Sequence, residues 1–159
     1  MSRYAGDADK VRKLVREAEV HRDVFIDEEL FQLEMDHLFA NTWVYVGHDS
    51  QVAKEGDFYT TTIGSQPVVM VRHSDGEVKV LLNRCPHKGV KIAGETCGNT
   101  GKVFRCPYHA WRFRTDGSLL SLPWTQGYEN TGFKDAPAAQ GMTRVRHVHN
   151  YRGFVFAKL

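Results

Sequence analysis

Cysteine is scarce in this sequence, with three among 159 residues. So small and odd a number does not build the disulfide framework of a small secreted domain, and it fits a reducing compartment. Long apolar runs are also missing, since no stretch approaches the length of a membrane-spanning helix. The first residues, MSRYAGDADKVRKLV, carry charges where a signal peptide needs an apolar run. We therefore expect a soluble, cytoplasmic protein with no membrane partner.

An excess of charge of one sign is absent as well. The 21 basic and 19 acidic residues are mixed along the chain and give a formal net charge of +2. A surface that binds nucleic acid needs clustered Lys and Arg, so nucleic acid is not expected as a partner. The length and the 42% share of hydrophobic residues suit one globular domain with a real core.

Helical periodicity is confined to the first forty residues. Asp27 is a plausible N-cap for a helix that continues to Phe39. An earlier amphipathic helix is predicted from Asp9 to Ala18, because apolar residues recur there at helical spacing. We therefore expect a short α-helical N-terminal arm over residues 1–40. The apolar positions of the first helix are Val11, Leu14, Val15 and Ala18.

After Trp43 the pattern changes to short β-rich runs broken by Gly, Asp and Pro, such as DFYTTTIG, PVVMVRH and GFVFAKL. Asp75-Gly76 and Asp116-Gly117 each lie between two such runs and predict tight hairpins, because both residue types tolerate positive φ. The polar segment from Thr125 to Gly141 is expected to be a loop. Residues 41–159 are therefore predicted to be all-β, as a small antiparallel sandwich or barrel.

Two short segments each carry one cysteine and one histidine. NRCPHKG contains Cys85-x-His87, and FRCPYHAW contains Cys106-x-x-His109. Each pair follows a strand-like run, so each is expected in a loop at the edge of a sheet. The intervening residues are enough for the two loops to face one another. Two thiolates and two imidazoles brought together in this way predict a metal site.

Three metals compete for this set of ligands. Zinc accepts two Cys and two His in a tetrahedron, but a zinc finger usually pairs Cys with Cys and His with His. A type-one copper site leaves the second cysteine unexplained. In a two-iron cluster of the Rieske kind, one iron takes both thiolates and the other takes both imidazoles. One ligand of each type in each loop is what that division predicts.

The segments CPHKGV and CPYHAW resemble the Rieske domain of aromatic ring-hydroxylating dioxygenases, in the N-terminal part of their large oxygenase subunit. The segment VFIDEELFQLEMDHLFANTWVYVGHDS resembles the family's lead-in, and YRGFVFAKL resembles the strand that closes the domain. The resemblance extends from about Val20 to Leu159. It implies a Rieske antiparallel β-sandwich or barrel with a cluster-binding subdomain, over residues 41–159.

The resemblance also implies the site. The cofactor is a [2Fe–2S] cluster, and Trp111 corresponds to the aromatic residue that covers it in the family. Lys88 corresponds to a basic residue usually found beside the first histidine. The implied metal ligands are Cys85 and Cys106 for the inner iron, and His87 and His109 for the outer iron.

Two positions depart from the family's pattern. Pro86 stands where the family often has Arg, and Ala110 stands where Gly is more frequent after the last ligand. The β-carbon of Ala110 would be strained only if the backbone there has positive φ.

The function implied by the resemblance is electron transfer within an oxidoreductase of aromatic hydrocarbon catabolism. The domain relays single electrons from a ferredoxin or reductase to a mononuclear non-haem iron. That iron belongs to a catalytic domain or neighbouring oxygenase subunit outside this chain. Because imidazole is neutral, a reduction potential of about −150 to +300 mV is expected, against about −400 mV with four thiolates. The alternative is a stand-alone Rieske ferredoxin, against which the helical arm counts.

Other candidate ligands have weaker sequence support. Cys97 is a possible alternative ligand, but no histidine accompanies it, which favours a small buried or semi-exposed thiol. His147 and His149 lie at alternate positions of a predicted strand and could begin a site with two histidines and one carboxylate. No carboxylate stands at a matching position nearby, and histidines are common on exposed strands.

Overall fold

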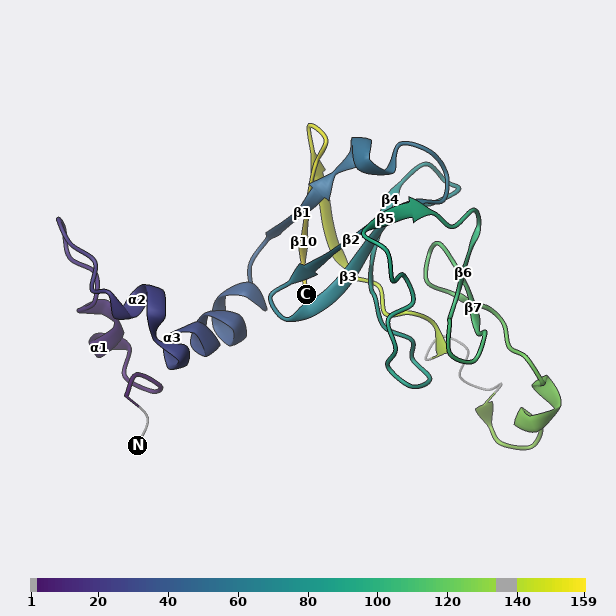
Figure 1. Ribbon diagram of the computed structural model, residues 1–159, viewed down its shortest axis with the longest axis horizontal. Helices are drawn as coiled ribbons and strands as arrows, with labels where there is room; N and C mark the ends of the chain where they lie inside the picture. The colour runs from purple at the N-terminus through teal and green to yellow at the C-terminus, as the bar shows by residue number, and fades with distance from the viewer. Residues whose placement is uncertain (1–2, 134–139) are drawn as a thin grey trace. The chain divides into compact units, whose positions relative to one another are not determined.

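The computed structural model describes residues 3–133 and 140–159. The chain forms two compact units, Met1–Thr42 and Trp43–Leu159. The first unit is helical and the second is built from β-strands, which Figure 1 shows in purple-blue and in blue to yellow. In the described part of the chain, no helix has both the length and the apolar character needed to span a bilayer.

The elements are short throughout, as expected for a chain with many turns. The helices are α1 (Ala8–Arg12), α2 (Asp23–Ile26), α3 (Glu28–Leu33), the π-helix η1 (Glu34–Phe39) and the 3-10 turns η2 (Asp49–Val52) and η3 (Thr125–Tyr128). The strands are β1 (Val44–His48), β2 (Asp57–Ile63), β3 (Gln66–Arg72), β4 (Val78–Leu82), β5 (Cys97–Asn99), β6 (Val103–Arg105), β7 (Arg112–Arg114), β8 (Leu119–Ser121), β9 (His147–Tyr151) and β10 (Phe154–Lys158).

The helix predicted from Asp27 is present with the expected cap. The Asp27 carboxylate accepts hydrogen bonds from the main-chain N–H groups of Glu29 (3.0 Å) and Leu30 (3.2 Å). The helix continues from α3 into η1, so its second half is wound as a π-helix rather than an α-helix. Helix α2 was not predicted, because four residues are too few for a periodic pattern.

The helix predicted over Asp9–Ala18 is wrong beyond its first turns. Helix α1 ends at Arg12, and Val15 then pairs with Val20 in an isolated antiparallel bridge. The main-chain N–H of His21 donates to the carbonyl of Leu14 over 2.7 Å, which extends this pairing. The local hairpin therefore takes the backbone groups that a longer helix would have used.

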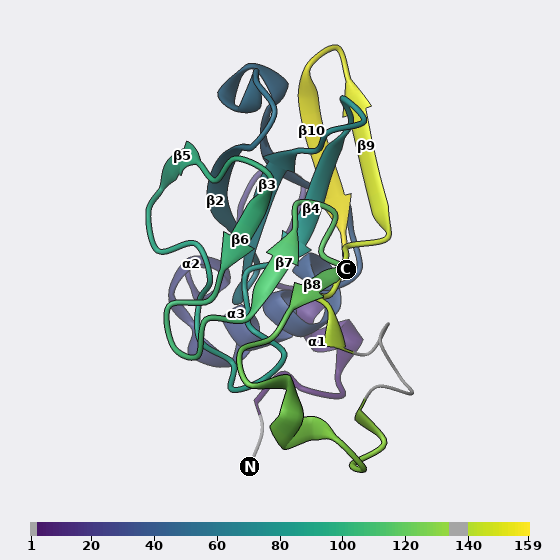
Figure 2. The same cartoon turned by 90° about the vertical axis from the view of Figure 1, so that its right-hand side faces the viewer.

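The described residues of the second unit form three antiparallel sheets, with strand orders β1-β10-β9, β4-β3-β2-β5 and β6-β7-β8. Figure 2 shows β9 beside β10, and β6, β7 and β8 next to one another. The prediction of an all-β, antiparallel architecture is confirmed. Strand β5 was not predicted, because Gly98 lies at its centre and its three residues are exposed.

Both Asp-Gly pairs form the predicted hairpin turns, but only their glycines have positive φ, +83° at Gly76 and +90° at Gly117. The aspartates contribute through their side chains instead. Asp75 accepts a hydrogen bond from the N–H of Glu77, and Asp116 accepts one from the N–H of Ser118, each over 2.8 Å. Such bonds are typical of Asx turns.

Two hydrophobic clusters form the core of this unit. The basal cluster is aliphatic apart from Met70 and includes Val68, Val80 and Val155. The distal cluster combines strand residues such as Val69 and Leu81 with the aromatic rings of Phe104, Trp111 and Phe113. Cys85 and Cys106 belong to the distal cluster. Residues 134–139 of the predicted loop Thr125–Gly141 lie outside the described residues.

Candidate metal centre

Two loops of similar form carry the predicted metal ligands. The first follows β4, where the N–H of Cys85 donates to the carbonyl of Val90 (2.9 Å) and the carbonyl of Cys85 accepts from Gly89 (2.8 Å). The second follows β6 and uses its cysteine in the same way. The N–H of Cys106 donates to Trp111 over 2.8 Å, and its carbonyl accepts from Ala110 over 3.1 Å. In each loop the cysteine backbone therefore closes the turn that holds the histidine.

The two cysteines lie together in the distal core. Each is only 2% exposed, and neither forms a disulfide. Burial raises the pKa of the Cys85 thiol, and the adjacent Cys106 side chain raises it further, although main-chain hydrogen bonds oppose the shift. A bound metal would displace the thiol protons and stabilise both cysteines as thiolates, because thiolate is the form that binds metal.

The two histidines form a second pair. Their ring centroids lie 4.7 Å apart with an interplanar angle of 65°. The Nδ1 atoms of His87 and His109 are buried, and no hydrogen-bond partner reaches them in the described structure. Burial, followed by the charges of His109 and Lys88, lowers the pKa of His87 and favours the neutral imidazole that metal binding requires.

Trp111 covers one of these rings. Its indole stacks on His87 with centroids 4.8 Å apart and an interplanar angle of 6°, and the side chain is buried. Tyr128 and Phe133 then pack edge-on against Trp111, at 6.3 and 5.6 Å between centroids. These two rings come from the segment predicted only as a polar loop, so sequence reasoning missed them. Together they extend the aromatic packing around Trp111.

Asn83 fixes the start of the first ligand loop. Its buried side chain donates to the carbonyl of Ala93 (2.8 Å) and accepts from the N–H groups of Ile92 (3.1 Å) and Ala93 (2.9 Å). Three hydrogen bonds to a segment about ten residues away hold both ends of the loop together. The sequence analysis missed this role. The available signal was an uncharged polar residue that ends the strand-like run VKVLL.

The remaining predicted residues lie at or away from this centre. Lys88 is exposed beside His87. Cys97 is exposed at the start of β5 and pairs with Tyr59 of β2. His147 and His149 are exposed on β9, where each ring makes a T-shaped contact with Trp43 at 6.4 Å between centroids. The structure therefore brings together the two ligand loops and Trp111.

The arrangement of donors favours one of the competing metal sites. Over residues 3–133 and 140–159, no three His, Cys, Asp or Glu side chains form a group that could hold a single ion. Instead, the donors form one pair of thiols and one pair of imidazoles. A zinc ion needs all four donors around one point, whereas a Rieske cluster needs two ligands at each of two irons. The paired donors fit the two-iron cluster.

Ala110, directly after His109, has a left-handed backbone with φ of +57°. This conformation costs a residue with a β-carbon roughly 1–2 kcal/mol. Glycine avoids that cost but loses roughly 0.5–1 kcal/mol of backbone entropy on folding. Ala110→Gly is therefore expected to raise the free energy of unfolding by about 0.5–1 kcal/mol, measured by chemical denaturation.

Ala53 provides the matched control, because it is exposed and its φ of −70° is ordinary. Ala53→Gly should lower the free energy of unfolding by about 0.5–1 kcal/mol, since only the entropic cost applies. Equal losses in the two variants would show that the left-handed backbone at position 110 stores no strain.

Comparison with known proteins agrees with this centre. Residues 42–140 match the model of the Rieske [2Fe-2S] domain. The chain is 37% identical over 134 residues to benzene 1,2-dioxygenase subunit alpha of Pseudomonas putida, which covers 84% of this chain and 29% of that protein. It is 35% identical over 151 residues to N,N-dimethyl phenylurea N-demethylase subunit alpha of Sphingobium sp., with 95% and 32% covered.

A solved structure supports the same relationship at the level of the fold. Naphthalene 1,2-dioxygenase from Rhodococcus sp., bound to indole, superimposes with a TM-score of 0.79 at 28% identity, over 88% of this chain and 31% of that one. The chain thus spans less than a third of the length of these three relatives. The family match covers more than half of the chain and includes both ligand loops, so the chain belongs to the Rieske [2Fe-2S] domain family.

Proposed function

We propose that this chain is the electron-transfer domain of a ring-hydroxylating oxygenase. The observation that carries the proposal is the pairing of two buried thiols with two imidazoles whose buried Nδ1 atoms lack partners among the described residues. The similarity to dioxygenase and N-demethylase alpha subunits supports the oxygenase context. Those relatives differ in the reactions that their names state, so electron delivery is the activity that their shared domain most simply explains.

The cofactor of the family is the [2Fe–2S] cluster, which accepts and gives up one electron at a time when bound. Cys85 and Cys106 are proposed as ligands of the inner iron, within the distal core. His87 and His109 are proposed as ligands of the outer iron through Nδ1, because that is the buried nitrogen without a partner on each ring. Lys88 adds a positive charge beside the first of these histidines.

The surrounding side chains prepare the loops for this role. Trp111 holds the His87 ring by stacking and keeps water from that face. Tyr108 stacks on His109 with 3.8 Å between centroids while 64% of its own surface stays exposed. Electrons are proposed to leave and enter on the histidine side, because the cysteines are enclosed by the core and the second loop reaches solvent at Tyr108.

The partners follow from the oxygenase context. The proposed electron donor is a ferredoxin or a reductase in the cytoplasm. The proposed acceptor is a mononuclear non-haem iron in a catalytic domain outside this chain, on the same polypeptide or on a neighbouring subunit. The relatives' additional length leaves room for such a domain, since the matched region is 29–32% of each.

The proposal is tested on the purified polypeptide that carries this sequence. It should be red-brown, contain about two irons and two labile sulfides per chain, and give a low-average-g EPR signal after reduction. A colourless protein that binds zinc instead would overturn the assignment. Oxygen consumption that requires the substrate, the donor and the intact Rieske domain would support the oxygenase. A redox-active protein that only passes electrons between other proteins would establish the stand-alone ferredoxin alternative.

A further inference from the structure

The outer face of the β1-β10-β9 sheet carries an almost complete layer of rings. The strand register places Phe156 between Tyr45 and His149, and Phe154 between His48 and Tyr151. Trp43 makes T-shaped contacts with His147 and His149, so it lies on the same face. We call these residues the aromatic face. Its members are Trp43, Tyr45, His48, His147, His149, Tyr151, Phe154, Phe156 and Lys158.

The aromatic face is a continuous surface rather than a set of scattered residues. Tyr45 lies 6.0 Å from Phe154 and 5.9 Å from Phe156 between ring centroids, and His48 lies 5.2 Å from Phe154. The alternate residues of β10, Val155 and Ala157, point into the basal core and are fully buried. The sheet is therefore packed on one side and covered by exposed rings on the other.

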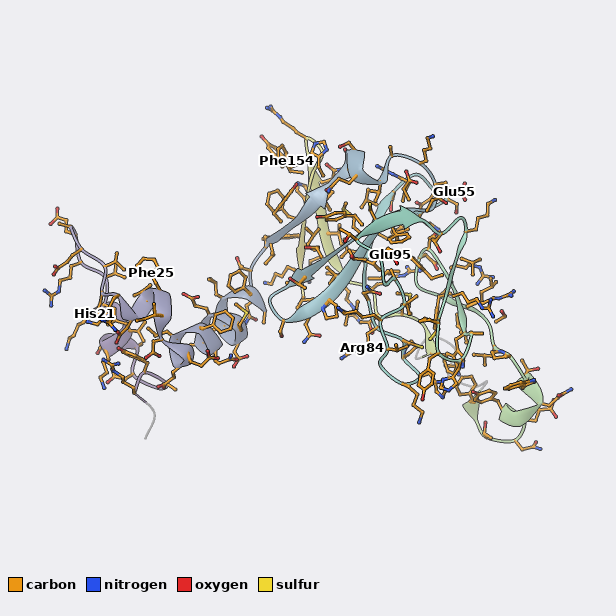
Figure 3. All side chains as sticks on the ribbon, viewed as in Figure 1. His21, Phe25, Glu55, Arg84, Glu95 and Phe154 are labelled. Carbon is orange, nitrogen blue, oxygen red and sulfur yellow. The ribbon has the colours of Figure 1, made fainter. Side chains whose placement is uncertain are left out.

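Four large side chains of the aromatic face remain about half exposed. The exposed fractions are 49% for Trp43, 50% for Tyr45, 58% for Tyr151 and 50% for Phe154. Figure 3 shows Phe154 at the end of the sheet where the β9–β10 hairpin turns. Soluble proteins seldom leave a contiguous patch of this kind uncovered, and such patches mark interaction sites. The aromatic face therefore requires a partner.

The chemistry of the face indicates a lasting contact. Among its nine residues, Lys158 is the one with a fixed charge, and none is acidic. Interfaces that stay assembled are rich in aromatic side chains and poor in charge at their centres. A mobile electron donor is guided by charge instead.

Charge of that kind is concentrated on the ligand loops. Glu95 is the single acidic residue between positions 84 and 112, and the basic residues there outnumber it. Figure 3 labels Arg84, which begins the first loop, and Glu95. The exposed basic residues of this region are Arg84, Lys88, Lys91, Lys102, Arg105 and Arg112. The charge of the basic loops suits an acidic electron donor. The aromatic face lacks such charge and suits a different partner.

The length of the relatives identifies that partner. More than two thirds of each relative lies outside the part matched by this chain. Strand β10 is the central strand of the aromatic face and ends at Lys158. In a polypeptide that continues past Leu159, a following domain starts beside this sheet and meets it at high effective concentration.

We infer that the aromatic face is the surface on which the catalytic domain of the oxygenase packs. This inference rests on the proposed function, and it adds the site of attachment. The aromatic face anchors the catalytic domain permanently, while the basic loops stay available on the histidine side, where electrons enter from the donor and leave towards the acceptor iron.

The inference is tested by cysteine labelling in the full oxygenase. Tyr45→Cys and Tyr151→Cys are made separately in a Cys97→Ser background, because Cys97 is itself exposed. Thr62→Cys is the matched control, since Thr62 is exposed on β2 in another sheet. Maleimide is expected to label both face variants at least about tenfold more slowly than the control, as a covered surface reacts only when it opens. The protection should persist when the protein is diluted.

Two results would overturn the inference. Labelling of both face variants as fast as Thr62→Cys would show that the aromatic face is open. Protection that disappears on dilution would show that a second copy of the chain, rather than the catalytic domain, covers it. The EPR signal of the same samples separates the two claims. An intact Rieske signal with rapid labelling contradicts only the covered face, whereas a missing signal in the unsubstituted protein contradicts the proposed function.

Discussion

Cys106→Ser is expected to lose essentially all of its iron, from about two atoms per chain to almost none, together with its colour. Cys106 is 2% exposed, lies against Cys85 and is one of the two cysteines proposed as ligands of the inner iron. A serine hydroxyl at this position is a far poorer ligand at neutral pH than a thiolate. Iron and labile sulfide analysis, together with the visible absorption spectrum, provides the measurement.

Cys97→Ser is the matched control for this prediction. It makes the same chemical change at the third cysteine, which is exposed on β5. This variant should keep its full iron and sulfide content and its EPR signal. Loss of iron in Cys97→Ser with retention in Cys106→Ser would exchange the roles of the two cysteines and refute the proposed set of ligands.

His109→Cys is expected to lower the reduction potential if a cluster still assembles. The substitution replaces a neutral imidazole with an anionic thiolate, which disfavours addition of an electron. The potential should fall by on the order of 100 mV or more, from the range of about −150 to +300 mV towards the −400 mV or so of all-thiolate clusters. A redox titration followed by EPR gives the value.

The control for this change is His147→Cys. His147 is exposed on β9 and makes a T-shaped contact with Trp43 rather than with either ligand loop. The same substitution there should leave the potential unchanged. A potential for His109→Cys that equals or exceeds that of the unsubstituted protein would contradict the coordination of the outer iron by two imidazoles.

The β architecture could be predicted because its signals are local. Short continuous runs of apolar residues, rich in Val and Phe, mark β3 and β10, and Asp-Gly pairs mark the turns at Gly76 and Gly117. Strand β5 has no such signal, because its pairing with β2 is decided by the tertiary structure. Helix α1 is shorter than its sequence pattern predicts. The apolar residues after Arg12 have helical spacing, but Val15 pairs with Val20 in a bridge instead.

The candidate site shows the same division. The two Cys and His pairs could be predicted because their types and spacing have chemical meaning within a few residues. The contact between His87 and Trp111 depends on how two loops meet, which the spacing does not specify. The contacts of Tyr128 and Phe133 with Trp111 could not be predicted either. These two residues lie in a segment rich in polar residues, which indicates a loop but not the packing of its rings.

Ala110 has the positive φ on which its predicted strain depends. The sequence analysis made strain at this residue conditional on positive φ, and the structure has φ of +57° there. The alanine is therefore a real departure with an energetic cost, while the hydrogen bond from its N–H to the carbonyl of Cys106 remains in place.

The separation of the interior into two hydrophobic clusters has a consequence for how the protein withstands iron starvation. The basal cluster contains none of the proposed ligands, but β3 and β4 supply alternate residues to both clusters, such as Val68 to the basal and Val69 to the distal one. The distal cluster contains both proposed cysteine ligands, so its packing is expected to depend on whether a metal cluster joins the two side chains. Missing iron is therefore expected to loosen the distal side of β3 and β4 first, while the basal side of the same strands holds the sheet together for later uptake of the cluster.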